Sequence, residues 1–539
     1  MFRSLTFIAL ALALAAPVLA DDGFKPSQAA LKAHVDFLAS DAMHGRDTDS
    51  PEYDIAAQYV ATRFAELGLK PAGDKGSFLQ HVPLVSARST SHGSVTLTEG
   101  GKQTALSFGE DYLPSASLKD AKVDLTAPLV FAGFGLVAPG YKRDDYAGLD
   151  VKGKIVVLLA GAPKAIPGEE RAHYGNGTTK AIEAQKRGAI GIITVETPAR
   201  AAIYPFARAA KLWDDKRMVW RQPDGSGYSA APAAPGLAYV SMKGAEKLFA
   251  GVKGGAAAIM AAAETPAGKV KTMALPASAR VSLDTEIKPA ESSNVAALIE
   301  GSDTALKSEV VVLSAHLDHV GIGPAVNGDS IYNGAMDNAV GIAAMLEVAR
   351  GFVASSAKPK RSILFLAVTA EEKGLVGADY FAQHPTVPKD RLVADVNLDM
   401  PIITYDFQDV VAFGADRSTL GPLVKRAADS IGVAVSPDSE PEQGIFTRSD
   451  HYRFVQQGVP SVFLVTGDKG PGVSANPDFL QHHYHQPSDQ PDLPFDWAAG
   501  AKFVTLNLAI ATTIADAPDR PRWNKGDFFG TLYDGFGAK

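Results

Sequence analysis

The second half of the chain alternates short apolar segments with helical patterns. Helical periodicity such as that over 338–353 separates the apolar segments. Strands that are apolar on both faces belong to sheets covered by helices on both sides, so the pattern predicts an α/β fold with a mixed, mostly parallel sheet. The five segments typical of such strands are 310–314, 363–368, 392–398, 410–413 and 460–465.

The first half of the chain shows more varied patterns. Residues 31–69 have helical periodicity, with Ile55, Tyr59, Val60 and Phe64 on one face, and residues 94–101 predict a strand that enters a hairpin turn. Strands and a helix between about 122 and 269 predict a smaller α+β domain. Its last part, 229–269, is rich in Ala, Gly and Pro, which favours a surface connection with a short helix.

The beginning of the chain predicts a cleaved export signal. Arg3 precedes an apolar run over 5–16, and small residues lead to Ala20, after which we expect cleavage. The run is too short to cross the ~30 Å apolar core of a membrane. We find no second long apolar run in the sequence, so we expect a secreted or periplasmic protein without stable membrane insertion.

These patterns divide the chain into five parts. They are a signal peptide (1–20), the N-terminal part of a large domain (21–121), an inserted domain (122–269), the main part of the large domain (270–517) and a C-terminal tail (518–539).

Charge and cysteine content limit the chemistry. The chain has 52 Lys and Arg against 60 Asp and Glu, without a basic block, which argues against nucleic acid as a partner. The absence of Cys excludes disulfides, thiol catalysis and thiolate metal sites, so any metal must be held by His and carboxylates. Neither a Gly-x-Ser-x-Gly nor a His-Glu-x-x-His motif is present, so serine hydrolases and single-zinc endopeptidases lose their usual sequence support.

Residues with metal-binding chemistry follow three of the predicted strands. Several carboxylates gathered with His at neighbouring strand ends would repel one another unless cations held them together, and zinc is the first choice for carboxylate and imidazole donors. Taken singly, each motif has an ordinary explanation: Asp337 before a helix is typical of an N-cap, and a Glu-Glu pair is typical of a solvated turn. The residues are His316, Asp318 and His319 after the first strand, Glu371 and Glu372 after the second, and Asp399 after the third.

Together these motifs resemble the zinc-dependent aminopeptidases of the leucyl-aminopeptidase type, a family that also includes glutamate-carboxypeptidase-like and transferrin-receptor-like proteins. The similar segments appear in family order over about 170 residues: 315–319, 334–338, 370–372, 397–399, 449–451 and 484–489. Residues 41–46 also look like the opening segment of this family. The middle block, through 144–154, resembles the protease-associated domain that such enzymes often carry as an insertion.

The resemblance implies two zinc ions. Asp337 would bridge them, with Glu372 and His485 completing one site and His316 and Asp399 the other. Glu371 would be the general base, and the Asp318 carboxylate would accept a hydrogen bond from His316 and fix its tautomer. No role follows from the resemblance for His319, His482 or His483. Residues 449–451 would shape the wall of the site or simply begin a helix.

The chain departs from the family pattern at one position, which concerns the oxyanion. Some relatives place a Tyr near the position of Phe446, which lacks a hydroxyl, so its role would pass to a zinc ion or to Tyr452 or Tyr484.

Three activities follow from the resemblance. An aminopeptidase that hydrolyses peptides through an activated water is the first. A carboxypeptidase or dipeptidase would need cations to hold the substrate carboxylate, for which Arg417, Lys425 and Arg448 are candidates, although a solvated surface explains them equally well. A cyclase or a non-enzymatic, receptor-like protein is less favoured, because all five ligand positions and the base are intact.

Overall fold

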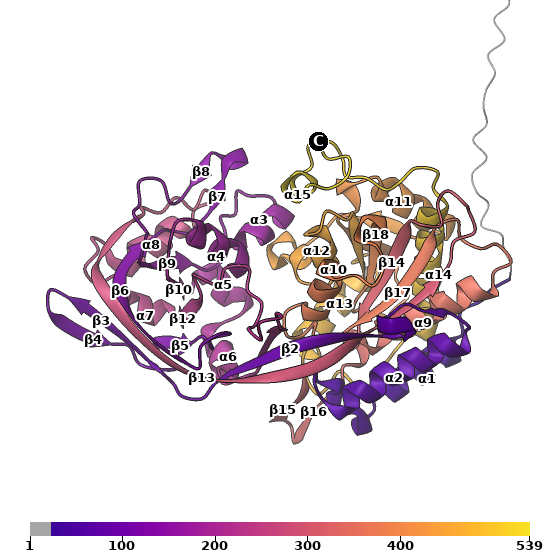
Figure 1. Ribbon diagram of the computed structural model, residues 1–539, viewed down its shortest axis with the longest axis horizontal. Helices are drawn as coiled ribbons and strands as arrows, with labels where there is room; N and C mark the ends of the chain where they lie inside the picture. Colours follow the sequence, from indigo (N-terminus) through magenta and orange to yellow (C-terminus); the bar gives the residue numbers. More distant parts are fainter. Residues whose placement is uncertain (1–22) are drawn as a thin grey trace, which may run out of the picture.

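The computed structural model describes residues 23–539, so the predicted signal peptide and its cleavage point lie outside the described residues. Two lobes, each built around a β-sheet, lie side by side, and the long strand β13 (Met273–Ile299) runs through both sheets (Figure 1).

The sheet of the larger lobe is mixed. Its central strands are parallel neighbours in the order β17 (Ser362–Val368), β14 (Val310–His316), β18 (Leu392–Leu398) and β21 (Ser461–Thr466). Antiparallel strands flank them: β13 pairs with β17, and β19 (Asp409–Phe413) pairs with β21. The predicted strands and the α/β class with a mixed sheet are confirmed. Beyond these lie β1 (Lys70–Pro71), β2 (Leu79–Ser89), β11 (Arg217–Trp220) and β20 (Ala434–Ser436).

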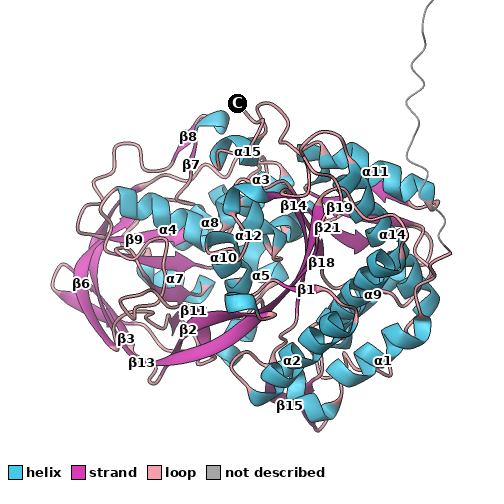
Figure 2. Ribbon diagram, turned by 45° about the vertical axis from the view of Figure 1, so that its right-hand side comes forward, coloured by secondary structure: helices cyan, strands magenta, loops and turns pink. Residues whose placement is uncertain are grey.

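Apolar cores cover both faces of this sheet. Val311 and Leu313 of β14 face one core, whereas Val310 and Val312 face the other, where α10 (Val376–Gln383) and α12 (His451–Val455) pack. This two-sided burial is the reason why the strands are continuous apolar runs in the sequence. The first core is covered by α1 (Gln28–Leu38), α2 (Pro51–Glu66), α9 (Val340–Ala354), α11 (Leu420–Ser430), α13 (Gly472–His482) and α14 (Trp497–Asp516) (Figure 2).

Helix α14 corrects the expectation that no second long apolar run follows the signal peptide. Its 20 residues are long and apolar enough to cross a membrane, but 61% of its apolar window is buried inside the protein. It packs against α9 and α11. An apolar helix of this kind is typical of a large core, and its composition alone does not distinguish it from a membrane span.

The predicted helical region 31–69 is two helices rather than one. The segment η1 (Asp41–Arg46) separates α1 from α2, because His44 and Gly45 adopt left-handed backbone angles there. A Cβ at Gly45 would lie 2.3 Å from the carbonyl oxygen of Tyr332, so only glycine fits this turn. Ile55, predicted on the apolar face, is 52% exposed, whereas Val60 and Phe64 are buried as predicted.

The sheet of the smaller lobe extends beyond residues 122–269. The first part of β13, over 273–284, pairs in this sheet before the same strand continues into the larger one. The pairing therefore places the limits of the lobe near residues 90 and 284, and no loop marks the second limit. In spatial order its other strands are β4 (Lys102–Ala105) and β3 (Ser94–Glu99) on one side of β13, then β6 (Lys122–Phe131), β9 (Ile155–Leu159), β10 (Gly191–Val195), β12 (Gly236–Val240) and β5 (Tyr112–Pro114) on the other.

The segment 229–269 is more regular than predicted. It contains β12 and two helices, α7 (Met242–Leu248) and α8 (Gly255–Ala263), rather than a surface connection. Some of its alanines, Ala238, Ala245, Ala256 and Ala263, pack into the core of the smaller lobe, so they serve as small core residues.

Helix α3 (Gly168–Gly175) joins the two lobes. Glu169 forms an ion pair with Arg417 of the larger lobe, and Arg417 Nη1 lies 3.1 Å from Asp527 Oδ2 in the C-terminal segment. His173 Nδ1 lies 2.8 Å from the hydroxyl of Tyr452, and both side chains are buried. The smaller lobe is therefore held beside the carboxyl ends of the central strands.

Candidate metal centre

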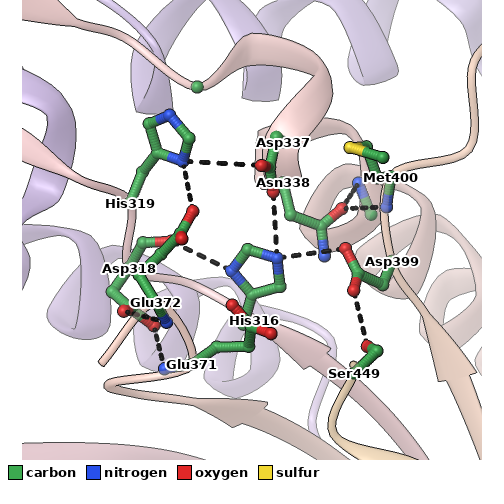
Figure 3. A network of polar contacts seen from close by, with 12 residues as sticks. His316, Asp318, His319, Asp337, Asn338, Glu371, Glu372, Asp399, Met400 and Ser449 are labelled. Carbon is green, nitrogen blue, oxygen red and sulfur yellow. Dashed lines mark hydrogen bonds and ion pairs between the residues drawn. The ribbon is translucent and has the colours of Figure 1, made fainter. Parts of the chain in front are cut away.

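The residues predicted to bind metal converge from separate elements. His316 is the last residue of β14, Asp399 directly follows β18, and Glu372 follows β17, so three strand ends meet at one edge of the sheet (Figure 3). Asp337 lies just before α9. Two groups of donors share Asp337, and within each group the ligand atoms all lie within 4.8 Å of one another. The first group is His316, Asp337 and Asp399, and the second is His319, Asp337 and Glu372.

The first group is built around the His316 ring. Nε2 lies 3.2 Å from Asp337 Oδ1 and 3.1 Å from Asp399 Oδ1. Nδ1 lies 3.0 Å from the backbone carbonyl oxygen of Asp318, which can only accept a hydrogen bond, so Nδ1 carries a proton. In the neutral ring the lone pair of Nε2 then faces two carboxylates, an arrangement that a cation between them stabilises.

This contact corrects the role expected for the Asp318 side chain. The backbone carbonyl of Asp318, rather than its carboxylate, accepts the proton of His316. The carboxylate instead accepts the backbone N–H groups of Glu371 at 3.0 Å and Glu372 at 3.3 Å. The turn after β14 brings the carbonyl to the ring and directs the side chain toward the end of β17. Asp318 therefore positions the Glu-Glu pair.

The second group, His319, Asp337 and Glu372, is also approached by His485. His485 Nε2 lies 3.2 Å from Asp337 Oδ2 and 3.1 Å from Glu372 Oε2, as the predicted ligand set requires. His319, to which the family resemblance assigns no role, has its Nδ1 at 2.8 Å from Glu372 Oε1. Its position three residues after His316, past the same strand end, is the feature of the sequence that could have indicated it.

Hydrogen bonds to the backbone hold Asp337 in place. Asp489 Oδ1 accepts the N–H of Met336 at 2.8 Å, and Asp489 Oδ2 accepts that of Asp337 at 3.0 Å. The amide of Asn338 donates to the carbonyl of Leu398 and accepts the N–H of Gly341, so it caps α9. Asp337 itself makes no capping hydrogen bond, so the N-cap explanation of this residue is wrong.

Two further residues support the centre. Ser449 Oγ donates to Asp399 Oδ2 at 2.5 Å, and the next residues form the start of α12, so the helix start expected for 449–451 is present. None of these three residues is among those that line the cavity beside Glu371. Arg46 is fully buried and donates to the carbonyls of Leu317 at 3.0 Å and Asn333 at 2.6 Å. The sequence had assigned Arg46 only to an opening segment, but it ties two loops of the centre together.

Backbone strain is concentrated at the centre. Ala370, Met400 and His485 have positive φ angles of 55°, 47° and 53°, although none of them is glycine. Ala370 precedes the predicted base Glu371, Met400 follows the predicted ligand Asp399, and His485 is itself a predicted ligand. Strained conformations of this kind cost about 1–3 kcal/mol each and persist at functional sites, where they direct side chains that a relaxed turn would not.

Proximity shifts the pKa values of the donors. Burial alone would lower the pKa of His485, but the nearby carboxylates of Glu372 and Asp337 outweigh the effect of burial and raise this pKa to about 10. Burial raises the pKa of Glu371 well above its ordinary value, against the opposing effect of His316. Such mutual dependence of buried acids and bases is typical of catalytic or metal-binding sites.

A cavity of about 290 Å³ opens beside Glu371 and Glu372. Tyr484 and Arg448 line it from the larger lobe, and Asn176, at the start of α4 (Gly177–Lys186), lines it from the smaller lobe. Both lobes therefore shape the space next to the donors. Phe446 is buried in an apolar cluster, so it faces no substrate.

The residues fit divalent metal ions. The donor set consists of imidazole nitrogens and carboxylate oxygens, which suit zinc. His319 Nδ1 and Glu372 Oε1 are buried and have no hydrogen-bond partner among the described residues, although 2.8 Å separates them. Unpaired buried groups cost about 1–3 kcal/mol each, and a bound cation removes that cost.

The sequence comparison decides the family. Residues 294–511 match the model of peptidase family M28. This segment belongs to peptidase family M28. It contains all the predicted ligands and the base. The whole chain also resembles the fold of the aminopeptidase from Aneurinibacillus sp. strain AM-1, with a TM-score of 0.53 at 20% identity, covering 92% of this chain and 95% of that one.

Several curated relatives of this chain carry aminopeptidase names. A probable leucine aminopeptidase 2 of Aspergillus oryzae is 30% identical over 188 residues, which is 33% of this chain and 34% of that protein. An aminopeptidase of Pseudomonas aeruginosa is 32% identical over 170 residues, 30% of this chain and 29% of that protein. The chain thus spans about a third of the length of the curated relatives it matches.

Proposed function

We propose that this protein is an exported zinc aminopeptidase with two ions, which removes residues from the amino ends of peptides. The observation that carries the proposal is the pair of donor groups that share Asp337 beside the cavity containing Glu371. The M28 membership and the names of the relatives agree with it. His316 and Asp399 would hold one ion, Glu372 and His485 the other, and Asp337 both.

The bound ions would polarise the scissile carbonyl and lower the pKa of the attacking water. Glu371 would accept the proton of that water and pass it to the leaving amine. Its buried carboxyl has a raised pKa, which increases its proton affinity, and its backbone is fixed by the Asp318 carboxylate. Tyr484 would donate to the developing oxyanion, since its hydroxyl has no hydrogen-bond partner among the described residues and it lines the same cavity.

A carboxypeptidase or dipeptidase is the second candidate, because one cation does face the cavity. Arg448 lines it, and no described carboxylate forms an ion pair with Arg448. The other two candidates are occupied elsewhere: Arg417 pairs with Glu169 and Asp527, and Lys425 pairs with Asp429 on the surface. Of the three cations expected from the sequence, only Arg448 could therefore hold a substrate carboxylate at the cavity. Arg453 also lines the cavity, but its guanidinium donates to the carbonyl of Gly374 and lies 3.9 Å from Asp379 Oδ1.

The test is the direction of cleavage. Purified protein loaded with zinc is incubated with peptides that have free or acetylated amino ends, and mass spectrometry shows which end shortens. Shortening from the amino end that acetylation blocks supports the aminopeptidase. Shortening from the carboxyl end would favour the second candidate, and no cleavage with zinc bound would refute both. A chelator-treated sample that regains activity with zinc controls for a contaminating serine peptidase.

A further inference from the structure

His319 has the surroundings of a metal ligand. Its side chain is fully buried, and its Nδ1 lies 2.8 Å from Glu372 Oε1 and 3.9 Å from Asp337 Oδ2. Neither ring nitrogen has a hydrogen-bond partner among the described residues, and neither has Glu372 Oε1. A buried histidine this close to a carboxylate needs either a ring proton that pairs with the carboxylate or a cation that both atoms bind.

The distances fit one ion with four donors. Neighbouring donors around a tetrahedral zinc with bonds of about 2.0–2.1 Å are roughly 3.3 Å apart. His485 Nε2 lies 3.2 Å from Asp337 Oδ2 and 3.1 Å from Glu372 Oε2, and the two separations of His319 Nδ1 lie on either side of this value. The two imidazoles stand edge to face with centroids 5.6 Å apart.

The backbone keeps the His319 ring in this position. Gly334 has a φ of +63°, and a Cβ there would lie 2.5 Å from His319 Cγ, so the ring packs directly against the glycine. The backbone N–H of His319 donates to the carbonyl of Arg46, whose side chain in turn holds the loop of Gly334. The ring is thus confined on the side away from the carboxylates.

We propose that His319 Nδ1 is a fourth protein ligand of the ion held by Asp337, Glu372 and His485. This rests on the proposed function, since it needs the two ions. The two sites then differ: one ion has four protein ligands, and the other has His316, Asp337 and Asp399. Four protein ligands are typical of structural zinc and three of catalytic zinc. The ion of His316, Asp337 and Asp399 would then be the one with room for the reacting water.

The first test is zinc binding, measured by competition with a chromophoric chelator. We expect wild-type protein to bind two ions and His319→Ala to bind one of them at least tenfold more weakly. His319→Asn distinguishes a ligand from a hydrogen-bond donor, because the Asn amide can replace Nδ1 as a donor to Glu372 but is a poor zinc ligand. It should weaken binding as much as His319→Ala. The matched control is His482→Ala, since His482 is exposed and pairs only with Asp478 on α13.

Unchanged affinity in His319→Asn would overturn the proposal in favour of a positioning hydrogen bond. The second test needs no variant: in a crystal structure of the zinc-loaded protein, His319 Nδ1 should lie about 2.0–2.1 Å from one ion. A separation beyond hydrogen-bond range from both ions would refute the assignment even where the variants fail to fold. Wild-type protein that binds no zinc would refute the proposed function as well, whereas zinc binding without His319 would refute this inference alone.

Discussion

Replacing Glu371 by Gln separates the general base from the metal ligands. The substitution keeps the shape of the side chain and removes its ability to accept a proton. No described residue forms a hydrogen bond with the Glu371 carboxylate, and the contact at 3.0 Å to Asp318 is made by the backbone, so Glu371→Gln should fold as the wild type does. The neighbouring Glu372, in contrast, faces His485 at 3.1 Å and His319 at 2.8 Å, where its charge is needed to hold an ion.

The expected loss follows from the role of the group. A positioned general base contributes about 10²- to 10⁴-fold to the rate, which is about 2.7–5.4 kcal/mol of activation free energy. We therefore expect Glu371→Gln to reduce kcat by about 10²- to 10⁴-fold with bound zinc unchanged. Glu372→Gln should lose zinc from one site and lose activity as a result. Excess zinc should restore part of the activity of Glu372→Gln, whereas it should restore no activity in Glu371→Gln.

The assay measures kcat by mass spectrometry of peptide products and zinc by elemental analysis on the same samples. Glu371→Gln with kcat within tenfold of the wild type and its full zinc content would refute the base assignment. Loss of zinc in Glu371→Gln, with normal zinc in Glu372→Gln, would show that the two glutamates have exchanged roles.

Three further predictions follow from named contacts. Tyr484→Phe should lower kcat by about 10²- to 10³-fold in steady-state kinetics, as the loss of an oxyanion donor does. The hydroxyl of Tyr452 contacts His173 instead, so Tyr452→Phe should lower kcat less than tenfold. Equal losses in the two variants would refute the assignment of Tyr484. Asp489→Asn replaces one of the two carboxylate oxygens that accept the backbone N–H groups of Met336 and Asp337, and it should weaken zinc binding by about 10- to 100-fold in a competition titration. Unchanged zinc affinity would show that the loop of Asp337 keeps its shape without this carboxylate. Burial lowers the pKa of His173 to about 4 from an ordinary 6.5. As the pH falls, this histidine is therefore protonated in the unfolded chain before it is protonated in the folded one. The free energy of unfolding, measured with urea, should decrease by up to about 3 kcal/mol between pH 6.5 and 4. His173→Gln should lack this part of the pH dependence, and an unaltered pH profile would contradict it.

The limits of sequence reasoning are clearest at β13. The sequence places the start of the large domain near residue 270, but residues 273–284 pair in the smaller sheet and 285–299 in the larger one. A single strand of 27 residues has no turn at the boundary, so no local pattern marks it. Only pairing with distant strands assigns each half to its sheet.

The candidate site was more predictable than its contacts. The resemblance to the zinc-dependent aminopeptidases implied the donors His316, Asp337, Glu372, Asp399 and His485, and the structure brings all of them together. The hydrogen-bond partners of these donors were harder to predict from the sequence, because they depend on the direction in which a turn orients its backbone carbonyls and side chains.

Two residues illustrate that dependence. Asp318 contacts His316 through its backbone carbonyl rather than its carboxylate, and Arg46 holds loops that lie about 270 positions away in the chain. Neither contact leaves a periodic pattern in the sequence.

The sequence by itself determined the strands, the class of the fold and the chemistry of the donors, because apolar periodicity and residue type are local properties. The tertiary structure alone decided that His319 joins the donors, that β13 serves two sheets, and that Asn176 of the smaller lobe lines the cavity beside Glu371. Each of these depends on the approach of segments far apart in the chain, and that approach is set by the packing of whole sheets and helices rather than by any local preference.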